Sequence, residues 1–339
     1  MNMKQWLEEI KKSDVKKAMP ILSFPCVGLL GVTVNELTSN SELQAKGMKL
    51  IADKCPTLAS VSMMDLSVEA EAFGAEIRFS DDEVPTVVGS IVNSPEDADK
   101  LEIPDLEKGR CLKYISAIKG ACELIKDRPV FAGVIGPFSL AGRLMDVSEA
   151  MINCCTEPEM VHLTMEKVSE FLITYIKAYK EAGANGIVMA EPLTGLLSPD
   201  LAEEFSEPYV RKIVEAVQDD EFIVIYHNCG DNILLMVDSI LATGAAAYHF
   251  GNVVEMKDML AKIPEDTVAM GNIDPARQIK GGTPESIKEE TMRIMSECCS
   301  YPNFVISSGC DIPPSSSWEN ITAFFEAVDE FYKNNRKDV

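Results

Sequence analysis

The sequence is poor in basic residues and has no long apolar run. Lysine and arginine total 31 against 54 aspartates and glutamates, which gives a formal net charge of −23. Nucleic-acid binding draws much of its affinity from neutralised phosphates, so this charge argues against nucleic acid and against anionic membrane surfaces as partners. No stretch approaches the roughly 20 apolar residues that cross a bilayer. The first segment, MNMKQWLEEIKKSDVKKAMP, predicts a polar helix without the apolar middle of a signal peptide, so we expect a cytoplasmic protein.

Histidine is scarce, with 3 residues, whereas cysteine is abundant, with 10. In a chain without an export signal, this richness predicts reduced thiols rather than a disulfide framework. Two adjacent pairs, Cys154–Cys155 and Cys298–Cys299, fall in predicted helices. Neighbouring side chains on a helix point about 100° apart, so neither pair is suited to hold one metal ion, and we interpret both pairs as packing residues.

Low-complexity linkers and solenoid-type repeats are also lacking, and what recurs is a short apolar run followed by an amphipathic helical segment. Alternation of buried strands and helices predicts a parallel sheet covered by helices, and eight such units favour a (β/α)₈ TIM-type barrel. We expect a single domain over 1–339, with an N-terminal helical extension at 1–19 and an excursion over the barrel mouth at 76–110. The eight expected strands are PILSFP (20–25), LASVSMMD (58–65), PVFAGVIG (129–136), NGIVMAE (185–191), FIVIYH (222–227), AAAYHF (245–250), TVAMGN (267–272) and NFVISSG (303–309).

Three metal-ligand side chains stand at the ends of two of these strands. His227 and Cys229 are two residues apart on an extended segment and therefore point the same way, while Cys310 follows the last expected strand. One imidazole and two thiolates suit Zn²⁺, and three protein ligands leave a fourth position for water or substrate. Since a barrel gathers its active site at the carboxyl ends of the strands, we expect these three residues to form one metal site. The alternative is that the cysteines are small buried hydrophobes.

Other polar residues at strand ends are predicted to reach the same face. Glu191 is a candidate catalytic residue that would hydrogen-bond the metal-bound histidine or the acceptor, with a structural role as the alternative. Asp274 is interpreted as the cap of the helix that follows it. His249 is interpreted as a satisfied barrel histidine, although it ends near the site, and His162 lies mid-helix away from any cluster.

Several segments together resemble the uroporphyrinogen decarboxylase superfamily over nearly the whole chain. They are MMDLSVEAEAFGAEI (63–77), GPFSLAGRLM (136–145), EAGANGIVMAEP (181–192), LLSPDLAEEFSEPYVRKI (196–213), GNIDPARQIKGGTPESI (271–287) and SSGCDIPPSSSWENITAF (307–324). The resemblance implies that Asp65 is the superfamily aspartate that faces the tetrapyrrole or its substitute. The alternative for Asp65 is a strand-end carboxylate that caps a loop.

Two features separate the branches of this superfamily. The decarboxylases carry an arginine-rich segment near the N-terminus, but the corresponding MPILSFPCVGLLGVTVNE has no arginine. The methylcobamide:coenzyme M methyltransferase branch carries His-x-Cys and a later Cys as zinc ligands, which match His227, Cys229 and Cys310. Its members often have a carboxylate after the sixth strand, where this chain has Gly251 and Asn252. Either water, Asn252 or Glu255 is then the further ligand, or the acceptor differs from coenzyme M.

The resemblance therefore implies a zinc-dependent methyltransferase that moves a methyl group between a corrinoid, held on a partner corrinoid protein, and a small thiol such as coenzyme M. Three alternatives stay open at this point. One is a demethylase that transfers methyl from a small compound to a corrinoid, another is uroporphyrinogen decarboxylation, and the last is a non-catalytic barrel with a structural zinc.

Overall fold

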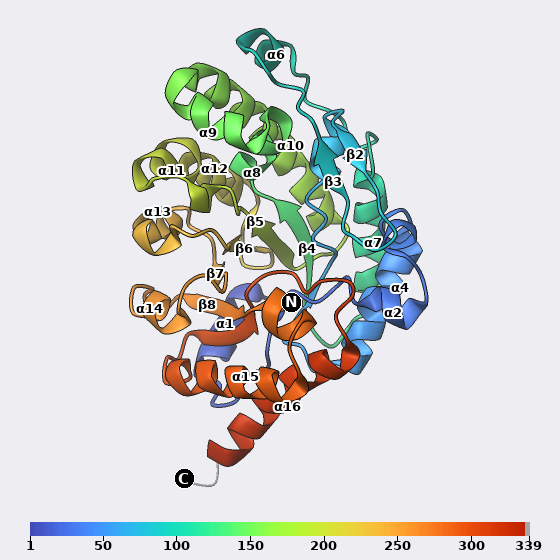
Figure 1. Ribbon diagram of the computed structural model, residues 1–339, viewed down its shortest axis with the longest axis vertical. Coiled ribbons are helices and arrows are strands. Elements are labelled where there is room, and N and C mark those ends of the chain that lie inside the picture. The colour runs from blue at the N-terminus through green and yellow to red at the C-terminus, as the bar shows by residue number, and fades with distance from the viewer. Residues whose placement is uncertain (336–339) are drawn as a thin grey trace.

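The computed structural model describes residues 1–335, which form a curled parallel sheet surrounded by helices (Figure 1). The sheet has seven strands in the order β1-β4-β5-β6-β7-β8-β9, and each neighbouring pair is parallel. Every residue of these strands is buried, as expected for a parallel sheet covered by helices. The strands are β1 (Ser60–Val61), β4 (Val130–Ile135), β5 (Gly186–Ala190), β6 (Ile223–Asn228), β7 (Ala247–Phe250), β8 (Val268–Ile273) and β9 (Phe304–Ser308).

The strand expected at 20–25 is absent, and this prediction was wrong. An extended segment just before it nevertheless bridges the two edges of the sheet. Met19 N donates to Ile306 O of β9 at 3.0 Å, and Leu58 N, just before β1, donates to Ala18 O at 2.8 Å. Pro20 has no N–H to donate, which limits regular pairing beyond this point. The segment thus occupies the eighth position around the sheet without forming a ladder.

Alternate residues of each strand belong to two different apolar cores. Ile223 and Ile225 of β6 pack inside the curl of the sheet, together with Val188, Val268 and Val305 from other strands. Their neighbours Val224 and Tyr226 belong to the core between the sheet and the helices. His227 continues the alternation of Ile223 and Ile225, so its side chain is directed into the inner space.

One end of the inner space is closed by helix α1 (Met3–Lys12). Its buried face, Met3, Trp6, Leu7 and Ile10, belongs to the same apolar core as the inner residues of the strands. The Trp6 ring lies 5.8 Å from the Phe131 ring of β4, measured between centroids. Because Phe131 stands near the amino end of β4, α1 covers the end opposite to the carboxyl ends of the strands.

The remaining helices follow the strands and cover the outside of the sheet (Figure 1). Several begin with a serine or threonine cap followed by proline, as at Ser198 and Thr283. The helices are α2 (Cys26–Leu30), α3 (Val34–Thr38), α4 (Ser41–Lys54), α5 (Val68–Ala72), α7 (Cys111–Leu124), α8 (Pro137–Met145), α9 (Val147–Thr156), α10 (Pro158–Glu181), α11 (Pro199–Phe205), α12 (Glu207–Val217), α13 (Val237–Ala242), α14 (Met256–Leu260), α15 (Pro284–Cys298) and α16 (Trp318–Asn335), with 3₁₀ turns η1 (Thr194–Leu196) and η2 (Ile233–Leu235) and a π-helical turn η3 (Pro275–Lys280). No helix within 1–335 is long and apolar enough to cross a membrane.

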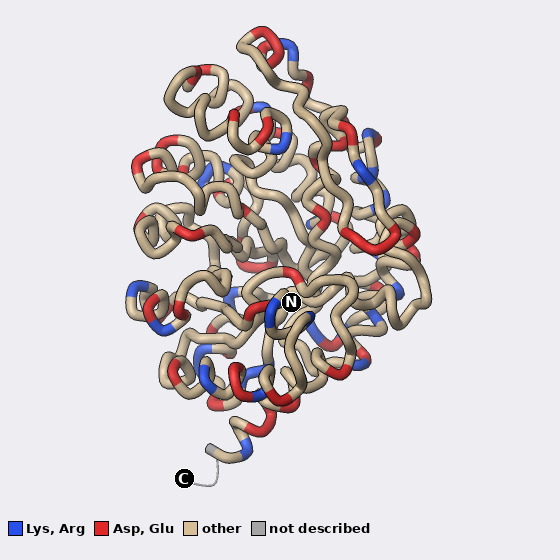
Figure 2. Tube along the Cα trace, in the orientation of Figure 1, with Lys and Arg blue, Asp and Glu red and all other residues tan. Residues whose placement is uncertain are grey.

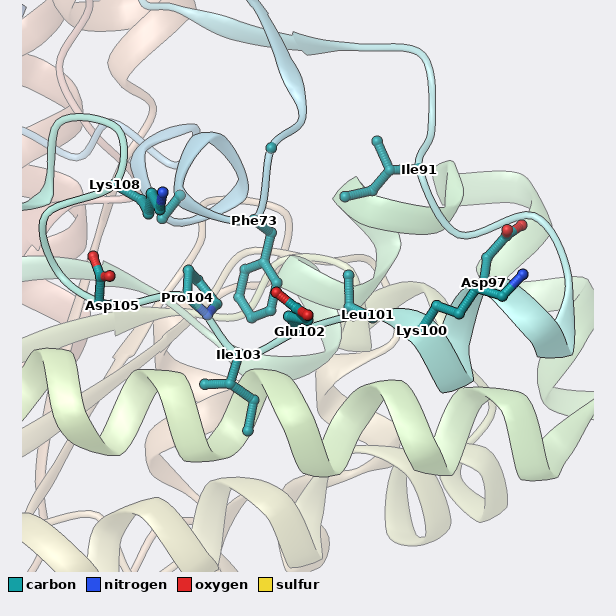
Figure 3. Close-up of a pocket in the computed structure, with 12 residues that line it drawn as sticks. Phe73, Ile91, Asp97, Lys100, Leu101, Glu102, Ile103, Pro104, Asp105 and Lys108 are labelled. Atoms are coloured by element: carbon teal, nitrogen blue, oxygen red, sulfur yellow. The ribbon is translucent and has the colours of Figure 1, made fainter.

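The region 76–110 forms a separate small unit. Strands β2 (Glu76–Arg78) and β3 (Thr86–Val88) pair antiparallel and are followed by α6 (Pro95–Lys100). Lys167 of α10 ties α6 to the barrel, since its Nζ donates to Ala98 O at 2.7 Å and Asp99 O at 2.6 Å. Beneath this unit is a cavity of about 620 Å³, where Phe73, Leu101 and Ile103 lie among charged side chains of both signs (Figure 3).

Candidate metal centre

His227, Cys229 and Cys310 come together, as the sequence predicts. Each offers one nitrogen or sulfur atom, and these ligand atoms all lie within 4.8 Å of one another. His227 is in β6, Cys229 follows that strand directly, and Cys310 follows β9 after one glycine. The cluster therefore stands at the carboxyl ends of the strands, where barrel enzymes build their active sites.

The imidazole of His227 is held from one side only. Its Nδ1 lies 2.8 Å from Nδ1 of His249, which stands opposite it on β7. Its Nε2 is buried and has no hydrogen-bond partner among the described residues. A buried polar atom without a partner is costly, so this nitrogen is suited to receive a ligand such as a metal ion.

The two cysteines influence each other's ionisation. Interaction with Cys310 lowers the pKa of Cys229, whereas interaction with Cys229, together with burial, raises the pKa of Cys310 to about 12. Metals bind cysteine as thiolate, so a bound metal would displace the thiol protons.

The residues after β7 supply no carboxylate to the cluster. A side-chain carbon at Gly251 would lie 2.5 Å from Cβ of Cys229, so the backbone packs too closely for any larger residue there. Asn252 lies against Gly309, the neighbour of Cys310. Glu255 instead forms an ion pair with Arg293 at 3.1 Å and is outside the cluster. One nitrogen and two sulfurs within reach of one ion fit Zn²⁺, which commonly takes such sets.

Asp65 lies apart from the cluster, in a buried charged network. Its Oδ2 accepts from Arg110 Nη1 at 2.5 Å and from Tyr114 OH at 2.7 Å, while its Oδ1 accepts from Ser67 N at 3.1 Å. Arg110 also pairs with Glu71 at 2.6 Å. Both oxygens of Asp65 therefore have partners within the chain, and the contact with Ser67 caps the loop after β1.

Glu191 is fully buried and caps helix α8. Its carboxylate accepts from Phe138 N at 3.0 Å and from Ser139 N at 2.6 Å, and also binds the Ser139 hydroxyl. Burial raises the pKa of Glu191 to about 7. Within residues 1–335 its side chain makes no hydrogen bond to the metal-site histidine. Its contacts therefore agree with a structural role, which the sequence left open as the alternative.

The remaining sequence predictions can be placed directly. Asp274 caps η3, since its Oδ1 accepts from Ala276 N and Arg277 N, both at 2.8 Å, which confirms the predicted cap. His162 stacks on Phe205, with ring centroids 4.5 Å apart, and is not part of the cluster. All ten cysteines are free, and the two adjacent pairs contribute nothing to the cluster.

His249 is a satisfied barrel histidine that ends near the site, as interpreted from the sequence, and strand register places it opposite His227. Sequence reasoning missed two other residues near the site, Ser307 and Arg143. Ser307 of β9 lies 2.7 Å from the other nitrogen of His249. Arg143 of α8 lines a cavity of about 340 Å³ that also includes Asp311, the residue after Cys310. A lone arginine near the end of the otherwise apolar helix 137–145 was the available signal for Arg143.

Comparisons with known proteins agree with this architecture. The family model described as uroporphyrinogen decarboxylase (URO-D) matches residues 18–331. The methylcobamide:CoM methyltransferase MtbA of Methanosarcina acetivorans is 29% identical over 79% of this chain and 78% of its own length. A uroporphyrinogen decarboxylase of Alcanivorax borkumensis is 25% identical over 87% of this chain and 85% of its own length. A solved methyltransferase from Methanosarcina mazei superposes with a TM-score of 0.85 at 25% identity and covers 98% of both chains. On this match the chain belongs to the uroporphyrinogen decarboxylase family.

Proposed function

We propose that this protein is a zinc-dependent corrinoid methyltransferase that transfers a methyl group from a methyl-Co(III) corrinoid to a small thiol such as coenzyme M. The observation that carries the proposal is the cluster of one imidazole nitrogen and two cysteine sulfurs at the carboxyl ends of the strands. The likeness to MtbA, whose name gives methylcobamide and CoM as its substrates, supports the same reaction. We also propose one barrel domain over 1–339, with the extension 1–19 and the excursion 76–110 at its mouth.

His227, Cys229 and Cys310 would hold the metal. A free thiol has a pKa of about 8.5 and is mostly protonated near neutral pH, so it is a poor nucleophile. Zinc, when bound, supplies deprotonation of the acceptor thiol and keeps its sulfur nucleophilic. In the transfer the sulfur–carbon bond forms and the cobalt–carbon bond breaks, the electron pair stays on cobalt as Co(I), and the thiol proton leaves to solvent.

The chain's own residues supply position and shelter. The cluster's histidine is buried and both cysteines are largely screened from solvent. The inner apolar core lies directly beneath, so water has access only from the carboxyl-end side. Holding both reactants at the right distance and orientation is the usual source of large effective concentrations.

Decarboxylation is the less supported function, although decarboxylases are also relatives. Several substrate carboxylates would need cationic partners, and the segment 19–36 contains no arginine. Incubation with uroporphyrinogen gives the direct check, since coproporphyrinogen as a product would revive this function.

The deciding experiment follows free methylcobalamin with zinc-loaded protein and coenzyme M under anaerobic conditions. We expect the methyl-cobalt absorption band to decay as Co(I) appears, and Cys310→Ser to abolish both the reaction and stoichiometric zinc. Cys155→Ser is the matched control, because Cys155 is an exposed thiol outside the cluster. A metal-free protein that retains full activity would refute the proposal. A protein that instead methylates Co(I) from a small methylated compound would reassign it as a demethylase.

A further inference from the structure

A line of hydrogen bonds runs from the metal cluster to the backbone of the N-terminal segment. Nδ1 of His227 lies 2.8 Å from Nδ1 of His249, and Nε2 of His249 lies 2.7 Å from Oγ of Ser307. The Ser307 hydroxyl in turn donates to Met19 O at 2.7 Å. The three side chains are buried and come from β6, its neighbour β7, and β9, which is separated from β7 by β8.

The carbonyl of Met19, at the end of this line, determines which atom is the donor in each of its hydrogen bonds. A carbonyl oxygen only accepts, so the one hydroxyl hydrogen of Ser307 is used on Met19. Ser307 Oγ then accepts from His249 Nε2–H. A neutral imidazole with its proton on Nε2 has a lone pair on Nδ1, which accepts from His227 Nδ1–H. His227 consequently carries its own lone pair on Nε2, the buried atom that has no partner among the described residues.

We infer that His249 and Ser307 are positioning residues that hold His227 in the Nδ1–H tautomer and aim its Nε2 at the metal. The inference rests on the metal centre of the proposed function. Outer hydrogen bonds of this kind commonly fix the orientation and tautomer of a ligating histidine. Here the outer partner is a second histidine, anchored through Ser307 to the segment that bridges the sheet edges.

Nitrogen NMR of the metal-free protein tests the tautomer directly, and it is practicable because the chain has only 3 histidines. Two-bond nitrogen–proton correlations distinguish the two neutral tautomers and the cation. His162→Gln removes the one histidine outside the line among residues 1–335 and assigns its signals. We expect His227 as the Nδ1–H tautomer and His249 as the Nε2–H tautomer, and the reverse assignment would overturn the inference.

Zinc affinity, measured by competition with a chelator, tests the consequence. We expect Ser307→Ala and His249→Phe to weaken zinc binding by about 10- to 100-fold. His249→Asn keeps an acceptor near the position of Nδ1 and should restore part of the affinity. Ser308→Ala is the matched control, because that neighbouring buried hydroxyl accepts from Ile21 N instead.

The outcomes separate this inference from the proposed function. Unchanged zinc affinity in both Ser307→Ala and His249→Phe would overturn the positioning role. A wild-type protein that binds no zinc would refute the metal centre itself, while the NMR assignment still decides the tautomers.

A different observation concerns the cavity of about 340 Å³ beside Asp311. Its walls come from residues that follow β1 and β9 and from the loop before and into β3, so it opens at the same end as the metal cluster. The walls are mostly apolar, and Arg143 is the one basic side chain among the lining residues Met64, Leu66, Ser67, Val84, Pro85, Thr86, Val87, Arg143, Asp311, Pro313 and Pro314.

Arg143 has a charge without a partner. It is half-buried, and burial alone lowers its pKa, with no opposing carboxylate. Within 1–335 the guanidinium forms no ion pair or hydrogen bond, and Asp311 in the same lining does not pair with it. A partly desolvated guanidinium is favourable when an anion supplies the missing hydrogen bonds.

The geometry points to Arg143 as the residue that binds the anionic end of the acceptor thiol. This assignment deepens the proposed function and depends on it. Arginine is suited to such a group because its planar fork matches two oxygens of an oxyanion.

Three thiols of similar length and different charge test the subsite: coenzyme M, 2-mercaptoethanol and cysteamine. We expect Arg143→Gln to raise the KM for coenzyme M by about 10-fold or more and to leave the KM for 2-mercaptoethanol unchanged. Arg143→Lys should recover part of the loss, and Arg211→Gln, an exposed arginine of α12, is the matched control. Equal changes for the charged and the neutral thiol would overturn the assignment.

Calorimetric titration of the metal-free protein with ethanesulfonate removes the dependence on turnover. Binding that is lost in Arg143→Gln supports the subsite, and equal binding in both proteins contradicts it. If no thiol reacts with the wild type, the methyl-transfer proposal fails, whereas the titration still decides whether Arg143 binds an anion.

Discussion

At the scale of single residues, Asp65 shows how a polar side chain at a strand end is used for stability. Its carboxylate is the buried counterion of Arg110, whose side chain is 4% exposed. We expect Asp65→Asn to lower the free energy of unfolding by about 3 kcal/mol, because the buried Arg110 loses its fully buried counterion and keeps only the partly exposed Glu71. Urea unfolding measures the loss, and zinc stoichiometry should not change.

The surface variant Asp53→Asn is the control for Asp65→Asn. Asp53 pairs with Lys49 one helical turn away on α4, and such exposed pairs are worth at most about 0.5 kcal/mol. An Asp65→Asn protein with wild-type stability but a reduced kcat would contradict the structural role and indicate contact with substrate.

Glu69 makes stability depend on pH. It is buried, its Oε1 accepts from Ile135 N at 3.1 Å, and its Oε2 has no partner among the described residues. Burial raises the pKa of Glu69 from 4.5 to about 8. Between these values the folded protein binds more protons than the unfolded chain, so stability falls as the pH rises through this window.

Glu69→Gln should remove that contribution. We expect the wild type to lose up to about 1.4 kcal/mol per pH unit relative to the variant between about pH 5 and pH 8. Below about pH 4.5 the difference should become constant. Urea unfolding at several pH values measures it, with the exposed Glu9→Gln as the control. Parallel stability curves for the wild type and Glu69→Gln would show that Glu69 does not titrate in this window.

The residue types of the metal cluster could be predicted from the sequence, whereas the supporting contacts could not. His227 and Cys229 follow from the period of a strand, and Cys310 from its place after another strand. The line through His249 and Ser307 depends on the register between β6, β7 and β9, which is set by tertiary packing. The roles of Asp65 and Glu191 depended equally on distant partners, Arg110 and the start of α8.

At the scale of elements, α1 covers the inner apolar core at the amino ends of the strands. Trp6 is 9% exposed and its ring lies against Phe131. We expect Trp6→Ala to lower the free energy of unfolding by about 3–5 kcal/mol, since it leaves a cavity under the strands. Urea unfolding measures the change, and zinc stoichiometry should persist because the cluster stands at the other end.

The half-exposed Leu124 at the end of α7 offers a control for Trp6→Ala, because Leu124→Ala removes little buried surface. Loss of zinc from a folded Trp6→Ala protein would contradict the separation of the two ends.

Seven of the elements expected as strands were found, and the first expected one was not. The apolar run PILSFP has the composition of a buried strand, but prolines at both ends remove the N–H groups that a ladder requires. The chain makes its sheet contacts just before this run, through Ala18 and Met19. The apolar pattern correctly predicted that this segment is buried. Its conformation was decided by the missing N–H groups of the two prolines.

At the scale of the whole molecule, charge and apolar surface are distributed differently. Acidic residues occur along the outer helices, with basic ones interspersed (Figure 2). Exposed apolar side chains, by contrast, recur on three successive loops at the carboxyl ends of the strands. Leu196, Leu235 and Val253 follow β5, β6 and β7 and are 43%, 70% and 51% exposed, respectively.

Under the proposed function, a protein that carries the methylcorrinoid would bring cobalt to the metal cluster from this end, because α1 closes the other. We therefore expect Leu235→Asp and Val253→Asp to lower kcat/KM by about 10-fold or more with a methylated corrinoid protein that serves the wild type, and to leave kcat/KM with free methylcobalamin unchanged. Stopped-flow spectra of the methyl-cobalt band measure both. Leu124→Asp, an exposed leucine where α7 leads back toward the amino end of β4, is the matched control. Only the protein-bound donor has a surface that could dock on the apolar loops. Equal losses of kcat/KM with the free and the protein-bound donor would therefore mean that these side chains affect the metal site rather than docking.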